Sequence, residues 1–135
     1  MSGTGNLTGL KVMIIDDSNT IRRSAEIFLK QSGCTVVMAE DGFDALAKIA
    51  DTEPDVVFCD ILMPRLDGYQ TCAMIKKSPR FKDTPVVMLS SKDGLFDRAR
   101  GRMVGSDQYL TKPFTKESLL KTVSEYAKRP ALSAA

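Results

Sequence analysis

The sequence predicts a doubly wound α/β domain built from five strand–helix units. Five short runs rich in Val, Ile, Leu and Met start about 20 to 30 residues apart, the length of one such unit. In the first, third and fourth runs, apolar residues follow one another without alternation, which is typical of parallel strands covered on both faces. Apolar residues at helical spacing follow each run, so we expect a helix after every strand.

The apolar residues place each expected element. The expected strands are residues 10–15, 35–39, 56–59, 86–89 and 108–111. The expected helices have these apolar faces, in chain order: Ile21, Ala25, Phe28 and Leu29; Phe43, Leu46, Ala47 and Ala50; Tyr69, Cys72 and Ala73; Phe96, Ala99 and Met103; Leu119, Leu120, Val123 and Tyr126 or Ala127. The third face is the least regular, because Ile75 falls just outside it.

Glycine, proline and aspartate mark the ends of these elements. Gly33 follows the first helix as a C-cap, and Pro130 ends the last helix. Pro54 and Pro85 precede the third and fourth strands. Ahead of three helical patterns stands an Asp-Gly pair whose aspartate can cap free backbone N–H groups; the pairs are residues 41–42, 67–68 and 93–94.

Composition narrows the classes of function. The 135 residues suffice for one domain, and a histidine count of zero excludes Ser-His-Asp catalysis and histidine-ligated metals. The 19 basic and 17 acidic side chains leave a net charge of +2, too small for a dedicated nucleic-acid surface. No apolar run is long enough to span a bilayer. We therefore expect a cytoplasmic protein without nucleic-acid binding or membrane insertion.

Residues 1–9 are rich in Gly, Ser and Thr and predict a flexible tail. We place the domain at residues 10–128 and a short C-terminal tail at 129–135. The methionines are expected mainly in the core. The cysteines form no CxxC pair and are expected to be reduced residues in or near the core; they are Cys34, Cys59 and Cys72.

Polar side chains follow four of the expected strands. In a parallel sheet, ligands bind outside the carboxyl ends of the strands, so these side chains converge on one edge. They are Asp16, Asp17, Asp60, Ser90, Ser91 and Lys112. Carboxylates gathered at one edge repel one another unless cations neutralise them, and Mg²⁺ suits oxygen ligands of this kind. Lys112 supplies a second cation.

These residue types support phosphoryl transfer to a carboxylate. Asp60, on the central strand, can act as a nucleophile and form an acyl phosphate. Asp16 and Asp17 can hold Mg²⁺, which offsets charge in the transition state. The chemistry needs no general base, because a carboxylate is already ionised at neutral pH.

The sequence resembles the receiver domains of two-component response regulators. Four segments carry the resemblance, and together with the intervening helices it covers Leu10 to Lys128: Ile14-Ile15-Asp16-Asp17-Ser18, Asp60-Ile61-Leu62-Met63-Pro64 running to Asp67-Gly68, Leu89-Ser90-Ser91, and Lys112-Pro113-Phe114. The resemblance implies a flavodoxin-like (βα)5 fold with strand order 2-1-3-4-5 and a cis Lys112–Pro113 bond. It is strongest to single-domain, chemotaxis-like regulators, particularly those of twitching motility in type IV pilus systems.

The resemblance also implies a role for each matching residue. Asp60 is expected to be the phosphoacceptor, and Mg²⁺ to be held by Asp16, Asp17, Asp60 and the backbone carbonyl of Leu62. Ser90 is expected to be the switch hydroxyl, Lys112 the active-site lysine and Tyr109 the switch aromatic. The implied partners are a histidine kinase of chemotaxis type and a downstream motility or pilus protein. We expect a monomer that signals by docking and catalyses only its own phosphorylation and slow dephosphorylation.

Several alternatives remain open. Asp17 could be only a helix cap, Ser90 an ordinary strand-end hydroxyl and Tyr109 a packing residue. One stretch of the sequence is basic and contains Lys92, Arg98, Arg100 and Arg102. We interpret it as a solvated helix face in preference to a docking surface. Other candidate functions are a flagellar-motor chemotaxis regulator, a Mg²⁺-dependent phosphohydrolase and an interaction module independent of phosphorylation.

Two positions depart from the chemotaxis pattern. Leu62 replaces a polar residue two places after the phosphoacceptor, and Lys92 replaces an acidic one two places after the switch hydroxyl. The leucine side chain cannot hydrogen-bond an attacking water, which predicts slow self-dephosphorylation. It also argues against a phosphohydrolase, because such enzymes generally carry a second acid at that position.

Overall fold

The computed structural model describes residues 6–91 and 97–131. In chain order, its elements are β1 (Lys11–Ile15), α1 (Asn19–Gln31), β2 (Thr35–Ala39), α2 (Gly42–Thr52), β3 (Val56–Asp60), α3 (Gly68–Lys77), β4 (Val86–Ser91), α4 (Arg98–Val104), β5 (Gln108–Lys112) and α5 (Lys116–Tyr126). All strand pairs are parallel and the order is β2-β1-β3-β4-β5. The predicted fold class and strand order are confirmed.

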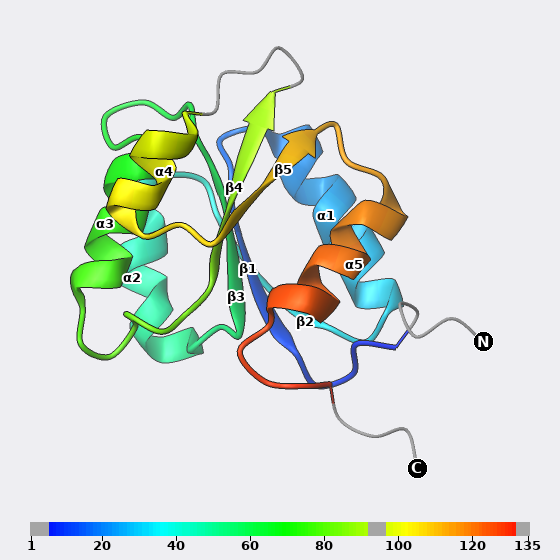
Figure 1. The fold of residues 1–135 in the computed structure, drawn as a ribbon. Helices are drawn as coiled ribbons and strands as arrows, with labels where there is room; N and C mark the ends of the chain where they lie inside the picture. The colour runs from blue at the N-terminus through cyan, green and yellow to red at the C-terminus, as the bar shows by residue number, and fades with distance from the viewer. Residues whose placement is uncertain (1–5, 92–96, 132–135) are drawn as a thin grey trace.

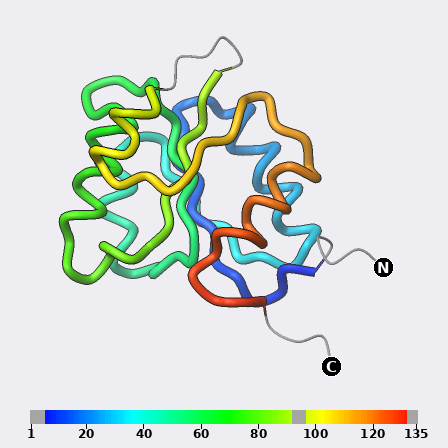
Figure 2. Tube along the Cα trace, viewed as in Figure 1, coloured from blue at the N-terminus to red at the C-terminus, as the bar shows by residue number. Residues whose placement is uncertain are grey.

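Helices cover both faces of the sheet (Figure 1). Helices α1 and α5 lie together on one face, and α2, α3 and α4 lie on the other, as the trace in Figure 2 also shows. Each layer encloses its own apolar core. Strands β1, β3 and β4 are buried along nearly their whole length, as the uninterrupted apolar runs predict.

Three strands extend further than their apolar runs. Strand β3 includes Asp60, β4 includes Ser90 and Ser91, and β5 includes Lys112. Backbone pairing therefore holds these polar residues in register with the neighbouring strand, for example Ser91 beside Lys112. The Lys112–Pro113 bond is cis, as expected.

Two helices present a different face from the one predicted. Helix α2 buries Gly42, Ala45 and Ile49, whereas Phe43 is 52% exposed. Helix α4 is short, and its buried residue is Gly101. Met103, expected in its apolar face, is 86% exposed. Ala47, Ala50 and Ala99 are also exposed, whereas Ile75, outside the predicted face of α3, is 1% exposed.

The capping predictions are confirmed at two of the three Asp-Gly pairs. Asp41 and Asp67 are the N-caps of α2 and α3, and each accepts a hydrogen bond from a backbone N–H of its helix. Helix α4 is capped by Asp97 instead. The pair Asp93-Gly94 lies outside the described residues, as do Lys92 and Phe96.

Some described residues of the two predicted tails are packed against the domain. Leu7 is 2% exposed, and its N–H donates to the Ser32 carbonyl at 2.7 Å. Arg129 donates to Asp55 Oδ1 at 2.9 Å and to the Gly9 carbonyl at 2.5 Å. Residues 6–9 and 129 therefore belong to the packed domain, because an apolar contact and a buried carboxylate hold them.

The cysteines are buried and free, as expected. Burial raises the pKa of Cys34 to about 11 and that of Cys72 to about 12, and it also raises the pKa of Cys59. These thiols are therefore protonated at neutral pH. Within residues 6–91 and 97–131, no helix has the length and apolar character needed to cross a membrane.

Candidate functional site

Three carboxylates meet at the carboxyl edge of the sheet. Asp16 directly follows β1 and Asp60 ends the neighbouring strand β3. One oxygen from each of Asp16, Asp17 and Asp60 can be chosen so that all three lie within 4.8 Å of one another. Asp16 and Asp60 are buried, whereas Asp17 is exposed. The cluster therefore consists of two buried carboxylates and a third that is open to solvent.

Lys112 is the cation paired with this cluster. It ends β5, which is separated from β3 by β4, and its side chain reaches across the edge of the sheet. Its Nζ lies 2.9 Å from Asp60 Oδ1 and 3.1 Å from Asp16 Oδ2. The lysine side chain is 18% exposed. The structure thus brings together four of the six side chains that the sequence places at strand ends.

The electrostatics of the cluster show an excess of negative charge. Burial and the neighbouring Asp16 charge raise the pKa of Asp60 to about 6, although the Lys112 hydrogen bond opposes the shift. Burial alone would lower the pKa of Lys112, but its contacts with Asp60 and Asp16 raise it overall. Lys112 therefore remains an ammonium at neutral pH.

The donor set fits a hard divalent cation. Three carboxylates and one ammonium carry a formal charge of −2, which a divalent ion neutralises. All three available ligands are oxygen atoms, as Mg²⁺ requires, and the exposure of Asp17 leaves room for the waters that Mg²⁺ retains. The residues present therefore fit the predicted magnesium site.

The loop from Ile61 to Asp67 borders the cluster and connects β3 to α3. Leu62 lies in this loop two residues after Asp60, and its side chain is 60% exposed. The start of α3 approaches the strand end so closely that a Cβ at Gly68 would overlap the Asp60 carbonyl oxygen. Only glycine fits that contact, so the Asp-Gly signal marks a close approach of backbones as well as a helix cap.

Ser90 lies at the end of β4, beside β3. It is 3% exposed, and its hydroxyl donates to the Ser91 carbonyl at 3.3 Å. The Ser91 hydroxyl is also buried and lacks a hydrogen-bond partner among the described residues. In this conformation the Ser90 hydroxyl is engaged with backbone, so a switch role requires it to change partner.

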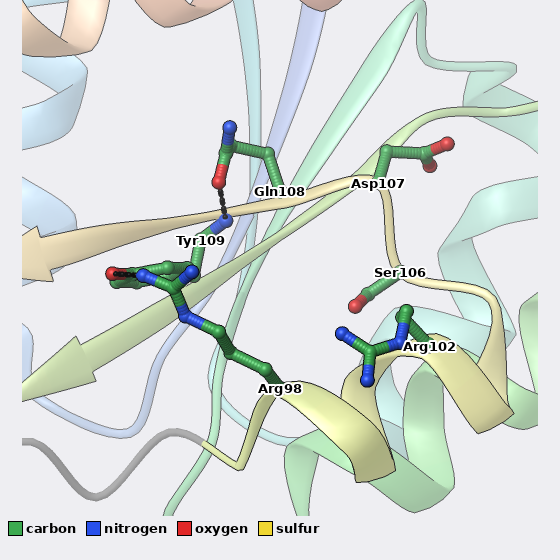
Figure 3. Close-up of a pocket in the computed structure, with 6 residues that line it drawn as sticks. All are labelled: Arg98, Arg102, Ser106, Asp107, Gln108 and Tyr109. Carbon is green, nitrogen blue, oxygen red and sulfur yellow. Dashed lines mark hydrogen bonds between the residues drawn. The ribbon is translucent and has the colours of Figure 1, made fainter.

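Tyr109 lies on β5 next to a surface hollow (Figure 3). The hollow has a volume of about 140 Å³ and is lined by Arg98, Arg102, Ser106, Asp107, Gln108 and Tyr109. Arg98 donates to the Tyr109 hydroxyl at 2.7 Å, and its guanidinium carbon lies 5.2 Å from the ring centre. Arg98 therefore holds Tyr109 by a hydrogen bond and a cation–π contact.

The basic stretch makes more contacts than a solvated face would. Arg98 contacts Tyr109, and Arg100 makes two further contacts. The Arg100 guanidinium carbon lies 4.4 Å from the centre of the Tyr69 ring, and its Nη2 lies 3.4 Å from Asp67 Oδ2. The sequence shows the basic residues, but it does not show that tyrosines from α3 and β5 lie beneath them.

Arg22 is a site neighbour that sequence reasoning missed. Its Nη1 donates to the Asp16 backbone carbonyl at 2.6 Å, and its Nη2 donates to Asn19 Oδ1 at 3.2 Å. Its place in the second turn of α1, on the side that returns to the end of β1, is the signal that could have identified it. Arg22 thereby fixes the backbone of one predicted metal ligand.

Comparison with known proteins identifies the class. Residues 12–124 match the response regulator receiver domain family, and the chain belongs to that family. It is therefore a receiver domain with the five-stranded fold and acidic edge described above. The family match and fold support a signalling domain rather than a catalytic enzyme.

The chain is also similar to individual members of this family. Over 118 residues the chain is 70% identical to protein PilG of Pseudomonas aeruginosa, covering 87% of each chain. It is 35% identical to response regulator MprA of Mycobacterium ulcerans over 123 residues, but spans only 52% of that protein. Among solved structures, chemotaxis protein CheY4 of Vibrio cholerae superposes with a TM-score of 0.82 at 34% identity, covering 87% of this chain and 98% of that one.

Proposed function

We propose that this receiver domain accepts a phosphoryl group on Asp60 from a partner histidine kinase of chemotaxis type. The observation that carries the proposal is the contact between Asp60 and Lys112 beside two further carboxylates. A buried nucleophile, a fixed cation and an acidic ion-binding cluster are the parts that phosphoryl transfer to a carboxylate needs.

Each residue of the site has its own role in the proposed phosphoryl transfer. Mg²⁺ would be held by Asp16, Asp17, Asp60 and the Leu62 carbonyl, and it supplies charge neutralisation at the phosphoryl oxygens. An Asp60 carboxylate oxygen attacks the phosphorus of the kinase phosphohistidine and forms a P–O bond. The P–N bond breaks, and its electron pair stays on the imidazole nitrogen. Lys112 pairs with a phosphoryl oxygen as its contact with Asp60 loosens.

The output of the phosphorylated domain is a change at α4, β5 and α5. The phosphoryl group brings strong acceptor oxygens to the sheet edge. Ser90 leaves the Ser91 carbonyl and donates to the phosphoryl group, which draws the end of β4 inward and gives Tyr109 space to turn. Phosphorylation thereby shifts an existing equilibrium toward a surface that a downstream protein binds.

The 70% identity to PilG supports a role in chemotaxis-like control of type IV pilus twitching motility, with a pilus or motility protein as the downstream partner. We also propose that the protein is cytoplasmic and monomeric. A flagellar-motor role rests on the more distant likeness to chemotaxis protein CheY4, at 34% identity. An exposed leucine, rather than an acid, two residues after Asp60 argues against phosphohydrolase activity.

Acetyl phosphate with Mg²⁺ provides the test, because it can donate a phosphoryl group without a kinase. Intact mass spectrometry should show one added phosphoryl group on the wild type and none on Asp60→Asn. Asp55→Asn is the matched control, because Asp55 is a buried aspartate that directly precedes β3, at the end opposite Asp60, and pairs with Arg129. It should be modified like the wild type. An adduct that persists in Asp60→Asn would overturn the assignment.

A further inference from the structure

Arg65, in the loop between β3 and α3, has a backbone conformation that side chains rarely adopt. Its φ is +69°, in the left-handed region. Holding a non-glycine residue there costs free energy, so such a residue persists where other contacts fix it and is often found near functional sites.

Two contacts fix the Arg65 side chain to the start of α2. One guanidinium nitrogen lies 2.8 Å from Asp41 Oδ2, and the guanidinium carbon lies 5.4 Å from the centre of the Phe43 ring. The other oxygen of Asp41, Oδ1, caps α2 by accepting from the Asp44 N–H at 2.8 Å. One oxygen of the Asp41 carboxylate thus caps α2, and the other pairs with Arg65 in the loop.

Backbone packing supports the same attachment. A Cβ at Gly42 would overlap the Thr71 hydroxyl and lie 2.8 Å from Leu66 Cδ2, so α2 touches both the loop and α3. At its inner end, the loop is held to the sheet by the Ile61 N–H, which donates to the Leu89 carbonyl at 3.1 Å. Leu62 lies between these inner and outer attachments.

The Arg65 contact contributes little to stability. The arginine side chain is 65% exposed, and exposed ion pairs are weak. The strained backbone offsets part of what the ion pair and ring contact supply. Its main consequence is therefore where the loop lies, rather than how stable the domain is.

We propose that Arg65 is a positioning residue of the acceptor site, which clamps the loop to α2 and so fixes the position of the Leu62 backbone, whose carbonyl would be a ligand of Mg²⁺. This inference rests on the proposed function, because it takes Leu62 as a metal ligand. Losing the clamp lets the loop take other positions, so that only part of the population would present a site competent to hold the metal.

The variants separate the clamp from its surroundings. Arg65→Ala removes the guanidinium, and Arg65→Gly does so while relieving the backbone strain. Asp41→Asn removes the charge but retains a side chain that caps helices well. Arg80→Ala is the matched control, because Arg80 makes the same two kinds of contact elsewhere: it lies 2.6 Å from Glu53 Oε1 and 5.1 Å from the Phe81 ring centre.

Two measurements test the proposal on the full chain. Mg²⁺ titrations followed by thermal unfolding should show affinity about fivefold weaker in Arg65→Ala, Arg65→Gly and Asp41→Asn, and unchanged in Arg80→Ala. The double variant Asp41→Asn/Arg65→Ala should lose no more than either single one. In metal-free protein, amide hydrogen exchange at Leu66 and Gly68 should be faster in Arg65→Ala than in Arg80→Ala.

The results that overturn the proposal are distinct from failure of the proposed function. If the wild type neither binds Mg²⁺ nor takes up a phosphoryl group, the proposed function is wrong and the inference falls with it. If the wild type does both, but Arg65→Ala binds Mg²⁺ within about twofold of wild type, only the clamp is refuted. Equal losses in Arg65→Ala and Arg80→Ala would also refute it.

Discussion

The ammonium of Lys112 lies 2.9 Å from the carboxylate of Asp60, although the two are 52 positions apart in the chain. The same ammonium lies 3.1 Å from Asp16. One cation thus faces two buried carboxylates, and the balance among these three groups determines how the site responds to pH, metal and substitution.

Removal of the ammonium should destabilise the metal-free domain. Lys112→Ala leaves the Asp16 and Asp60 carboxylates without their cation, and we expect a loss of about 2 kcal/mol at pH 7 in urea unfolding with a chelator present. The pKa of Asp60 should rise further. The loss should shrink near pH 4, below the raised pKa of Asp60, because that carboxyl is then protonated in both proteins; an equal loss at both pH values would contradict this explanation.

Neutralisation of Asp60 should have the opposite effect on stability. The pKa of Asp60 is about 6 in the folded protein, against 3.8 for an ordinary aspartate, so the folded state holds the proton more tightly. Stability therefore falls as pH rises from about 4 to about 6 and stays reduced above. Without Mg²⁺ at pH 7, Asp60→Asn should be more stable than wild type by about 1–3 kcal/mol.

Two controls accompany the Asp60→Asn prediction. Asp55→Asn should be destabilised, because the Asp55 carboxylate accepts from Arg129 and from the Lys11 N–H. Added Mg²⁺ should reduce or reverse the advantage of Asp60→Asn, since the variant lacks one of the proposed metal ligands. An Asp60→Asn protein less stable than wild type at pH 7 would show that repulsion does not dominate the site.

Arg98 should restrain Tyr109. Arg98 donates a hydrogen bond to the Tyr109 hydroxyl and stacks on its ring. Arg98→Ala should therefore shift the Tyr109 conformational equilibrium about fivefold toward the conformation proposed for the domain phosphorylated on Asp60. Fluorine NMR of fluorotyrosine-labelled protein, with Tyr109→Phe to assign the signal, measures that population. Arg100→Ala is the control, because Arg100 stacks on Tyr69; equal Tyr109 shifts in both variants would refute a specific restraint.

Leu62 should slow loss of the acyl phosphate. Leu62 lies two residues after the proposed acceptor Asp60, is exposed, and has no hydrogen-bonding group in its side chain. Leu62→Asn supplies an amide that can hold the attacking water, and we expect decay about tenfold faster, equivalent to about 1.4 kcal/mol off the barrier. Leu62→Ala controls for the smaller side chain. Unchanged or slower decay in Leu62→Asn, followed by intact mass, would refute this role.

The sequence predicts the sheet and the contents of its functional edge because both follow from local patterns. Uninterrupted apolar runs indicate buried parallel strands, and the polar residues that end them must share an edge. Asp16, Asp60 and Lys112 meet for that reason. The strand order and the individual roles of Ser90 and Tyr109 came from family resemblance instead, since spacing alone does not distinguish one sheet order from another.

The contacts that escaped prediction join side chains far apart in the chain. Periodicity placed Phe43 in a buried face, but Phe43 lies under Arg65, a loop residue 22 positions later. Leu7 lies in a polar segment and is buried because α1 ends beside it. Arg98, the first residue of α4, contacts Tyr109 on β5 across 11 positions of the chain. Helical spacing describes one element and carries no information about its neighbour.

The central claim is that Asp60 carries the phosphoryl group, and chemical trapping tests it most directly. The protein is incubated with acetyl phosphate and Mg²⁺ and then treated with borohydride, which reduces an aspartyl phosphate to homoserine. Tandem mass spectrometry of the peptides then locates the homoserine. We predict homoserine at position 60, dependent on Mg²⁺ and absent when acetyl phosphate is omitted. Homoserine at Asp16, Asp17 or any other aspartate, with position 60 unmodified, would contradict the account.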